Sequence, residues 1–450
     1  MNPTAQSAAL AKLDYAHGKE LARQVFHETM AAIDVRHTLL AKLKFQDGVL
    51  EAGEVSYPLG RPPRVVAFGK AANRMAAVLE EILGGYIEAG VAVGPAESSN
   101  KLAHFRYILG GHPYPTLGSL EGAQAAAELV SNLTPDDTVI FLVSGGGSAL
   151  LAQPIDRSIT LADLIDFNRV LVTSSLPIEE INVLRKHVSA VKGGRLGVRA
   201  CPARQLTIFI SDVPDHLPSM IASGPTLPDE STAEQAYELA ERSGLVRQFP
   251  ASIRKFFEGR ELPETPKPGD PRFANSHHFC LLANRDAVEG ALAAAKKLGF
   301  ASQIDRGPWD ADYRQVVHDN LVALEALSQE HPGHPVCLVV GGEVTCPVTG
   351  PGVGGRNQAF VLEAVPQIAG RRRVVLSAGT DGRDGNSPTS GAVADGQTLS
   401  RAQVLGLDPA AYLAGSDAYS FFRSLGDTLD TGFTDNNVRD VRIWLDFGAA

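Results

Sequence analysis

The strongest constraint on the fold is a set of short apolar runs that alternate with segments of helical spacing. RVVAF (Arg64–Phe68), TVIFLVS (Thr138–Ser144) and LTIFISD (Leu206–Asp212) have the length of strands and consist mostly of apolar residues. Strands of this kind are buried on both faces, and their alternation with helices is typical of a parallel sheet covered by helices. We therefore expect an α/β protein whose first domain is a doubly wound parallel sheet.

The stretch Gly259–Asn275 interrupts this alternation, because it is rich in proline and charge and has no periodicity. We interpret it as a linker. We expect a first α/β domain over residues 1–258, the linker over 259–275 and a second α/β domain over 276–450. The sequence leaves open whether the segment from Asp427 onward returns to the first domain.

Composition narrows the classes of function. The chain has 450 residues, 44% of them hydrophobic, and a formal net charge of −10 without a long basic run, which disfavours nucleic-acid binding. No segment approaches the ~18 apolar residues of a membrane span, and the N-terminus lacks the apolar core of a signal peptide. The four cysteines form no CxxC pair, so we expect a cytoplasmic protein without a structural zinc site. The oligomeric state stays open, a homo-oligomer included.

Two loops that follow predicted strands suit phosphate. In AFGKAANRMA, Lys70 comes directly after a strand and before a helix, where backbone N–H groups already attract anions. In VSGGGSALL, three glycines let the backbone approach a ligand, and the following serine can cap the helix or touch a phosphate. Ligands of open α/β sheets bind beyond the carboxyl ends of the strands, so we predict anion contacts there. An exposed lysine and a tight turn are the simpler alternatives.

Further along the chain, a basic helical segment and a carboxylate at a strand end are candidate site residues. In NVLRKHVSAVKGGRLG, helical spacing places Arg185, Ser189 and Lys192 near one face, which is either a solvated basic face or an anion site. Asp212 lies at the end of LTIFISD, a favoured place for a metal-binding or general-base carboxylate.

The second half contains a glycine-rich loop and a pair of aspartates. Gly350, Gly352 and Gly355 formally match GxGxxG, but neither the preceding strand nor the later acidic residue of a dinucleotide site is present. Arg356, directly after the last glycine, instead suits anion binding at a helix start. In SAGTDGRDG, two aspartates leave a strand through glycine turns, which suits either plain turns or Mg²⁺.

Seven motifs occur in a fixed order: GKAANRMA, VSGGGSALL, INVLRKHVSAVKGGRL, SDVPxxxPSMIASGPT, GGEVT…GGRNQ, SAGTDGRDG and TDNNVRD. The chain resembles the class II glycerate kinases, the glycerate 2-kinase family whose C-terminal part is called the MOFRL domain. The resemblance extends from about Val65 to Val441, nearly the whole chain.

The resemblance implies ATP-dependent phosphorylation of D-glycerate to 2-phosphoglycerate with Mg²⁺. It also implies an active site in the cleft between a Rossmann-like first domain and a smaller, MOFRL-type α/β second domain. Lys70 and Arg356 match the presumed catalytic cations of the family, and Asp212 matches the aspartate of its SDVP segment. Members of this family have also been labelled hydroxypyruvate reductases.

The other roles are hypotheses drawn from the chemistry of phosphoryl transfer, which depends on positioning and charge neutralisation. We assign the nucleotide phosphates to Gly145, Gly146, Gly147, Ser148 and Lys192. We assign glycerate to Arg185, Ser189 and Asn357, with Lys192 as a further candidate for its carboxylate. We assign Mg²⁺ to Asp381, Asp384 and Glu343.

The sequence departs from the family pattern in three places. Asp215, His216 and Leu217 replace a common Gly-Asp-Asp stretch, and Ala359 replaces a common glutamate. The segment GFTDNNVRD (Gly432–Asp440) replaces a GPTGTNVND-like segment. We expect these changes to alter substrate preference without altering the reaction.

Two competing functions belong to other classes. An NAD(P)H-dependent hydroxypyruvate reductase would use the formal GxGxxG, with Arg371–Arg373 facing a 2′-phosphate. A non-catalytic sensor of small acids would keep the cationic residues but would have no use for the three aspartates at strand ends.

Overall fold

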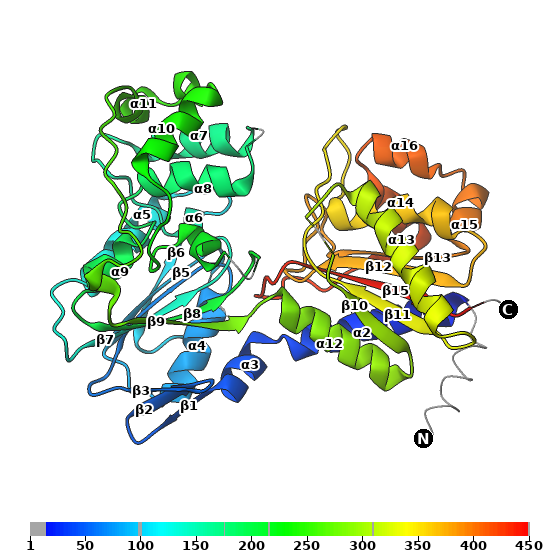
Figure 1. Ribbon diagram of the computed structural model, residues 1–450, viewed down its shortest axis with the longest axis horizontal. Coiled ribbons are helices and arrows are strands. Elements are labelled where there is room, and N and C mark those ends of the chain that lie inside the picture. Colours follow the sequence, from blue (N-terminus) through cyan, green and yellow to red (C-terminus); the bar gives the residue numbers. More distant parts are fainter. Residues whose placement is uncertain (1–14, 98–100, 175, 215–216, 308–309, 449–450) are drawn as a thin grey trace. The chain divides into compact units, whose positions relative to one another are not determined.

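In the computed structural model, described over residues 15–97, 101–174, 176–214, 217–307 and 310–448, two six-stranded sheets organise the chain (Figure 1). Each sheet forms the centre of one compact unit. The central unit comprises Val35–Leu281, and the terminal unit comprises Met1–Asp34 together with Leu282–Ala450. The chain therefore crosses between the units twice.

The sheet of the central unit has the order β6-β5-β4-β7-β8-β9. Its strands are β4 (Arg64–Phe68), β5 (Ala89–Gly94), β6 (Phe105–Leu109), β7 (Thr138–Val143), β8 (Arg204–Ile210) and β9 (Ser276–Leu282). The pairs β6–β5, β5–β4, β4–β7 and β7–β8 are parallel. Numbered along the chain, this order is 3-2-1-4-5-6, the order of a doubly wound Rossmann sheet. The predicted fold class is confirmed.

Helices cover this sheet and extend beyond it. They are α3 (Val35–Lys42), α4 (Ala72–Leu83), α5 (Leu117–Leu129), α6 (Gly147–Leu150), α7 (Leu161–Val172), α8 (Ile178–His187), α9 (Arg195–Ala200), α10 (Ala233–Arg242) and α11 (Ala251–Glu258). Capping boxes begin α7 at Thr160 and α10 at Thr232. α7, α8, α10 and α11 bury a separate apolar cluster that includes Phe167, Leu184 and Phe249. A small antiparallel sheet joins β1 (Leu43–Gln46), β2 (Val49–Ala52) and β3 (Val55–Pro58).

The sheet of the terminal unit is mixed, with the order β10-β11-β15-β12-β13-β14. Its strands are β10 (Ala301–Asp305), β11 (Val336–Val340), β12 (Arg373–Gly379), β13 (Gly391–Asp395), β14 (Thr428–Leu429) and β15 (Asp440–Asp446). β10 and β11 are parallel, whereas β15 runs antiparallel to both of its neighbours. The carboxyl ends of β11 and β12 therefore lie at the same edge as the start of β15.

Helices cover both faces of this second sheet (Figure 1). They are α2 (Tyr15–Ala32), α12 (Asn284–Leu298), α13 (Tyr313–Glu330), α14 (Arg356–Ile368), α15 (Thr398–Val404), α16 (Pro409–Ala414) and α17 (Ala418–Leu425). α2 and α12 pack on each other and on the sheet, while α13 and α14 pack together on β11 and β12. The core between the sheet and α13 and α14 includes Phe360 and Trp444, which are fully buried.

The unit boundaries differ from the predicted domain boundaries. The stretch 259–275 does not separate the units, because the strand after it, β9, lies beside β8 in the central sheet. Within this stretch Leu262 and Thr265 are buried, and Arg195 donates a hydrogen bond to the carbonyl of Pro263. Proline and charge indicated an irregular backbone correctly, but an irregular segment can still pack against the protein that precedes it.

The N-terminal end of the chain also differs from the prediction, and the C-terminal end settles a question that the sequence left open. The first helix belongs to the terminal unit, where Lys19 on α2 pairs with Asp427 at 2.7 Å. The last segment does not return to the central unit, because β15 is an inner strand of the terminal sheet. Sequence patterns reveal strands but not their partners, so neither assignment was available from the pattern alone.

Candidate functional site

In the central sheet, the strand order reverses between β4 and β7, and the loops after these strands contact each other. The backbone N–H of Lys70 donates to the carbonyl of Gly145 at 2.9 Å, and the N–H of Ala71 donates to Oγ of Ser144 at 3.0 Å. Gly69 has φ +121, and a Cβ there would lie 2.2 Å from Oγ of Ser144, so only glycine fits. Ligands of doubly wound sheets bind at this reversal point. The fold thus brings together the two loops that the sequence predicted as anion sites.

A chain of hydroxyl and amide groups continues from the second loop. Oγ of Ser148 lies 2.6 Å from Oγ of Ser223, which donates to Oδ1 of Asn182 at 2.8 Å. Ser223 and Asn182 are buried. Sequence reasoning missed both, although they lie within the motifs INVLRK and IASGPT and therefore carried a signal.

Two cations, Arg185 and Lys192, lie near this hydroxyl chain. Lys192 is only 6% exposed, and its Nζ donates to the carbonyl of Leu151, at the end of α6, at 3.3 Å. Arg185 lies on α8 one turn after Asn182, and its Nε donates to Oδ1 of Asn168. Within the described part of the chain, neither cation forms an ion pair.

Burial changes the ionisation of both cations. Burial, together with the charge of Arg185, lowers the pKa of Lys192 to about 7. Burial alone lowers the pKa of Arg185 to about 10. Burying a cation is costly unless an anion compensates it, and among the described residues none pairs with these two, so an anionic ligand would compensate them.

Neighbouring residues of the same motif have structural roles. Nζ of Lys186 pairs with Asp229 at 2.9 Å, and both side chains are buried. Ser189, predicted to bind substrate, donates to the carbonyl of Gln153 and accepts from the N–H of Lys192. Its hydroxyl thus stabilises the turn after α8 and orients Lys192. These hydrogen bonds within the protein differ from the predicted contact with glycerate.

Asp212 follows β8 by two residues and is half-buried at the same carboxyl edge as Lys70. The strands β4, β7 and β8 are adjacent, so the loops after them share one edge of the sheet. Asp215 and His216, where the sequence departs from the family pattern, lie outside the described residues.

In the terminal unit, Arg356 is the first residue of α14 and is held by two carboxylates. Its Nε and Nη2 donate to Asp440 at 2.6 and 2.9 Å, and Nη2 lies 3.0 Å from Glu343. Burial would lower the pKa of Arg356, but the charges of Asp440 and Glu343 raise it above its ordinary value. The side chain is still 36% exposed. Sequence reasoning missed Asp440, although the motif TDNNVRD contains it.

A second residue that the sequence did not single out, Asn284, fixes the backbone around Arg356. Its Nδ2 donates to the carbonyls of Val438 and Asp440, and its Oδ1 accepts from the N–H of Gly342. One amide thus ties together the two segments that supply the carboxylates around Arg356.

Two predicted ligands in this unit have structural roles instead. Asp384 is buried and accepts hydrogen bonds from the N–H groups of Asn357 and Gln358, at the start of α14. Burial is the main cause that raises the pKa of Asp384, to about 7, against these hydrogen bonds. Asn357, predicted to bind substrate, is buried and accepts from Ser377 at 2.5 Å. Both side chains therefore fix the start of the helix.

The predicted metal site is not formed as a cluster. Across the described ranges, no group of three or more His, Cys, Asp or Glu side chains is arranged to hold a metal ion. Glu343 pairs with Arg356, Asp384 is bound by α14, and Oδ1 of Asp381 accepts from the N–H of Arg383. The oxygens of Asp384 already accept backbone hydrogen bonds in the interior, so its observed contacts differ from the predicted metal contacts.

The glycines of the formal GxGxxG have a packing role. A Cβ on Gly350 or Gly352 would lie 2.5 or 2.6 Å from the carbonyl oxygen of Gly415, and no strand directly precedes them. The loop needs glycine because another loop crosses it closely, and a dinucleotide fingerprint is not present.

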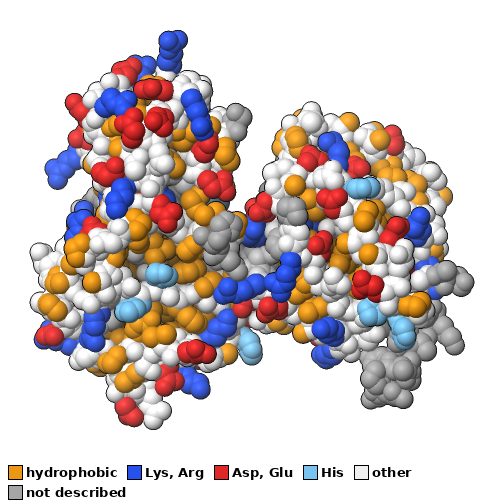
Figure 2. Space-filling view, viewed as in Figure 1, with side chains coloured by type: hydrophobic (Ala, Val, Ile, Leu, Met, Phe, Trp, Pro, Cys, Tyr) orange, Lys and Arg blue, Asp and Glu red, His pale blue; other side chains and the backbone are white. Residues whose placement is uncertain are grey.

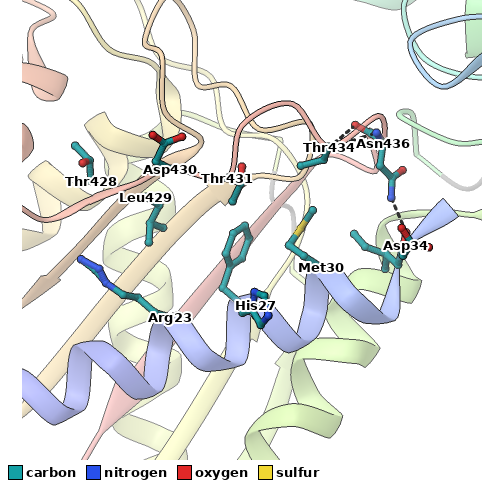
Figure 3. Close-up of a pocket in the computed structure, with 12 residues that line it drawn as sticks. Arg23, His27, Met30, Asp34, Thr428, Leu429, Asp430, Thr431, Thr434 and Asn436 are labelled. Carbon is teal, nitrogen blue, oxygen red and sulfur yellow. Dashed lines mark hydrogen bonds between the residues drawn. The ribbon is translucent and has the colours of Figure 1, made fainter. Parts of the chain in front are cut away.

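Two cavities of the terminal unit differ in composition. One, of about 600 Å³, lies between α2 and the segment Thr428–Asn436, with Arg23, His27 and Met30 on the helix side (Figure 3). The other, of about 400 Å³, contains Arg356 and lies around the start of α14. Only the second of these two contains a residue that the motifs singled out as catalytic.

The surface agrees with the charge of the sequence. On the face that Figure 2 shows, Lys and Arg side chains are interspersed with Asp and Glu side chains and form no continuous basic stripe. Among the described residues, no helix is both long and apolar enough to cross a membrane.

Comparison with known proteins agrees with this arrangement. A family model described as "Domain of unknown function (DUF4147)" matches residues 21–258, and the MOFRL family model matches residues 336–440. A D-glycerate 2-kinase of Thermotoga maritima is 36% identical over 386 residues, which are 85% of this chain and 90% of the relative. A glycerate 2-kinase of Pyrococcus horikoshii is 32% identical over 431 residues, 94% of this chain and 96% of the relative.

A solved structure shows the same fold over most of the chain. The crystal structure of glycerate kinase from Thermotoga maritima matches with a TM-score of 0.81 at 32% identity, and covers 95% of this chain and 99% of its own. One relative, from Agrobacterium vitis and 33% identical over 435 residues (95% of this chain, 94% of the relative), carries the provisional name of a hydroxypyruvate reductase. The motifs, the two matched domains and the relatives together place this chain in the glycerate 2-kinase family, which combines DUF4147 and MOFRL domains.

Proposed function

We propose that this chain is an ATP-dependent kinase that phosphorylates D-glycerate to 2-phosphoglycerate. The observation that carries the proposal is the cation pair Arg185 and Lys192, which lies beside the loops at the reversal point of the central sheet and has no carboxylate partner among the described residues. The names of the two glycerate 2-kinases among the relatives support it independently.

The carboxylate of glycerate is the anion that fits this pair. It is small enough for a buried position, and two cations at one place can bind its two oxygens through charge-assisted hydrogen bonds. The hydroxyls of Ser148 and Ser223 are suited to the hydroxyl groups of the same substrate. We therefore assign Lys192 to the carboxylate rather than to the nucleotide.

The charges for phosphoryl transfer are assigned to the flanking loops. Lys70 neutralises the transferring group, and the Gly145–Ser148 loop offers backbone N–H groups to its oxygens. Asp212 orients the attacking hydroxyl or accepts its proton. Arg356 matches the second presumed catalytic cation of the family, and its guanidinium is held by two carboxylates.

ATP is the phosphoryl donor that a glycerate kinase implies, and Mg²⁺ belongs to this proposal. Magnesium bound to a nucleotide needs only one or two protein carboxylates, since phosphate oxygens and water supply the other ligands. Asp384 does not fit this role, because α14 already uses its oxygens. Asp381 and Glu343 are partly exposed and are the candidates that fit.

The test is a pair of assays on the purified full-length chain. In the first, formation of ADP is followed with D-glycerate, Mg²⁺ and ATP, and with each component omitted in turn. In the second, oxidation of NADH is followed with hydroxypyruvate. We expect ADP only when all three components are present, and no oxidation of NADH.

The outcomes separate the three functions. Rapid consumption of NADH without turnover of ATP would establish the reductase. Binding of glycerate without any chemistry in either assay would establish the sensor. The position of the new phosphate, read by ³¹P NMR, distinguishes 2-phosphoglycerate from its 3-isomer.

A further inference from the structure

The cavity of about 400 Å³ around the start of α14, which we call the α14 cavity, combines an apolar and aromatic wall with two guanidinium groups. It is lined by Tyr313, Val344, Cys346, Arg356, Tyr412 and Leu413, among others. Apolar and aromatic side chains thus form much of its wall, together with the guanidinium groups of Arg314 and Arg356.

The guanidinium of Arg356 has one nitrogen that can donate a hydrogen bond to a ligand. Nε and Nη2 of Arg356 are used by Asp440 and Glu343, and Nη1 has no hydrogen-bond partner among the described residues. The two carboxylates fix the plane of the group, so Nη1 has a defined direction. A fixed donor next to an apolar wall suits a ligand with a flat apolar part and an anionic part.

We infer that the α14 cavity binds the nucleotide, with the adenosine part against the apolar wall and a phosphate oxygen on Nη1 of Arg356. This inference rests on the proposed kinase activity, because that activity requires a nucleotide. It adds a binding site on the terminal unit. The volume lies within the range of about 300–1,000 Å³ that is usual for small-molecule sites.

The first test uses the thiol of Cys346, which lines the cavity and is half-buried. Alkylation by iodoacetamide is followed residue by residue by mass spectrometry, with and without ATP. Cys201 and Cys280, which belong to the central unit, are internal controls. At an ATP concentration about ten times its Kd, we expect alkylation of Cys346 to slow on the order of tenfold while the controls keep their rates.

The choice of ligand makes this test specific. Adenosine and AMP should also protect Cys346, whereas inorganic triphosphate and D-glycerate should not. If inorganic triphosphate protects as well as ATP does, the wall does not bind the base and the inference is wrong. Equal rates with and without saturating ATP overturn it as well.

A substitution in the wall provides the second test. Leu413→Glu places a carboxylate against the nucleotide, and we expect it to raise the KM for ATP roughly tenfold while the KM for glycerate stays unchanged. The matched control is Met30→Glu in the cavity of Figure 3, which should leave both KM values unchanged.

The test of the cavity is separate from the test of the function. A protein that turns over ATP and glycerate but shows an unchanged KM for ATP in Leu413→Glu keeps the kinase function and loses this inference. A protein that shows protection of Cys346 by ATP but no turnover keeps the nucleotide site and loses the proposed reaction.

Discussion

The two sheets of this protein present cations at their carboxyl edges in opposite ways. At the central sheet, Arg185 and Lys192 have no ion pair within the described residues, and burial lowers the pKa of both. At the terminal sheet, Arg356 is held by Asp440 and Glu343, and its pKa is raised. Among the described residues, the two cations at the first edge have no carboxylate partner, whereas the cation at the second edge has two.

This difference indicates different uses of positive charge. An uncompensated buried cation costs stability in the empty protein and recovers it when an anion binds, so it marks a site for an anionic substrate. A cation fixed between carboxylates attracts anions less but has a defined geometry, which is what stabilisation of a transition state requires. The predictions below test this contrast, from the largest expected effect to the smallest.

The largest effect is expected at Lys70. Lys70→Ala should lower kcat by about 10²–10³, because removal of one well-placed electrostatic contact typically costs that much. The thermal midpoint should change little, since the side chain is half-exposed. Steady-state kinetics and calorimetry provide the two readouts. A correctly folded variant that keeps more than about a tenth of the activity would identify Lys70 as a surface lysine.

A slightly smaller effect is expected when an ammonium replaces the planar guanidinium of Arg356. Arg356→Lys should lower kcat roughly 10²-fold, because an ammonium cannot bind two carboxylates and a phosphate in one plane. Arg371→Lys, an exposed position of the same unit, is the matched control and should keep full activity. Equal activity of both variants would show that charge alone suffices at Arg356, and would remove the contrast between the two edges.

At the central sheet, removal of the charge of Lys192 should weaken substrate binding but increase the stability of the empty protein. Lys192→Met should raise the KM for glycerate roughly 10- to 100-fold, the value of a charge-assisted hydrogen bond of ~1.5–3 kcal/mol. The same variant should be more stable than the original protein in the absence of substrate, since a buried charge is removed. An unstable variant with an unchanged KM would make Lys192 a structural residue.

The pH dependence of stability should also differ between the original protein and Lys192→Met. The pKa of Lys192 is lowered to about 7 in the folded protein, while an unfolded lysine keeps its proton to about pH 10. Between these values the unfolded chain binds more protons, so the free energy of unfolding of the original protein rises with pH. The stability advantage of Lys192→Met should therefore be largest below pH 7 and shrink above it. Unfolding by urea at several pH values measures this difference.

The smallest effect is expected in the hydroxyl chain. Ser148→Ala removes one neutral hydrogen bond to substrate and should raise the KM for glycerate about fivefold, the equivalent of ~1 kcal/mol. The KM for ATP should stay unchanged. If instead only the KM for ATP rises, the hydroxyl of Ser148 binds the nucleotide, as the sequence first suggested, and its assignment to glycerate is wrong.

The carboxyl edges themselves could be predicted from the sequence. Strands such as RVVAF and TVIFLV are confirmed as β4 and β7, because runs of β-branched and apolar residues form strands that are buried on both faces. The motifs after them lie at the expected edge, because a parallel sheet places all its strand ends together. Family membership followed from long motifs in a fixed order, and the comparisons confirm it.

Roles that depend on burial could not be predicted in the same way. Asp384 and Asn357 resemble site residues in the sequence, yet the start of α14 uses both in the interior. Asp440 and Asn284 were not predicted as site residues, yet they fix Arg356 and the backbone around it. A polar residue in a motif carries no information about whether its partner is a ligand or the backbone of a distant segment.

The sequence by itself determined the fold class of the chain, its family and the edges at which its chemistry is arranged, because these depend on local periodicity and on motifs within short segments. Only the tertiary structure decided which segments share a unit: α2 joins the terminal sheet, β9 the central one, and β15 an inner position between β11 and β12. It also decided which cations are compensated. Pairing between residues such as Arg356 and Asp440, 84 positions apart, is selected by the burial of whole strands and helices, and no local pattern encodes that choice.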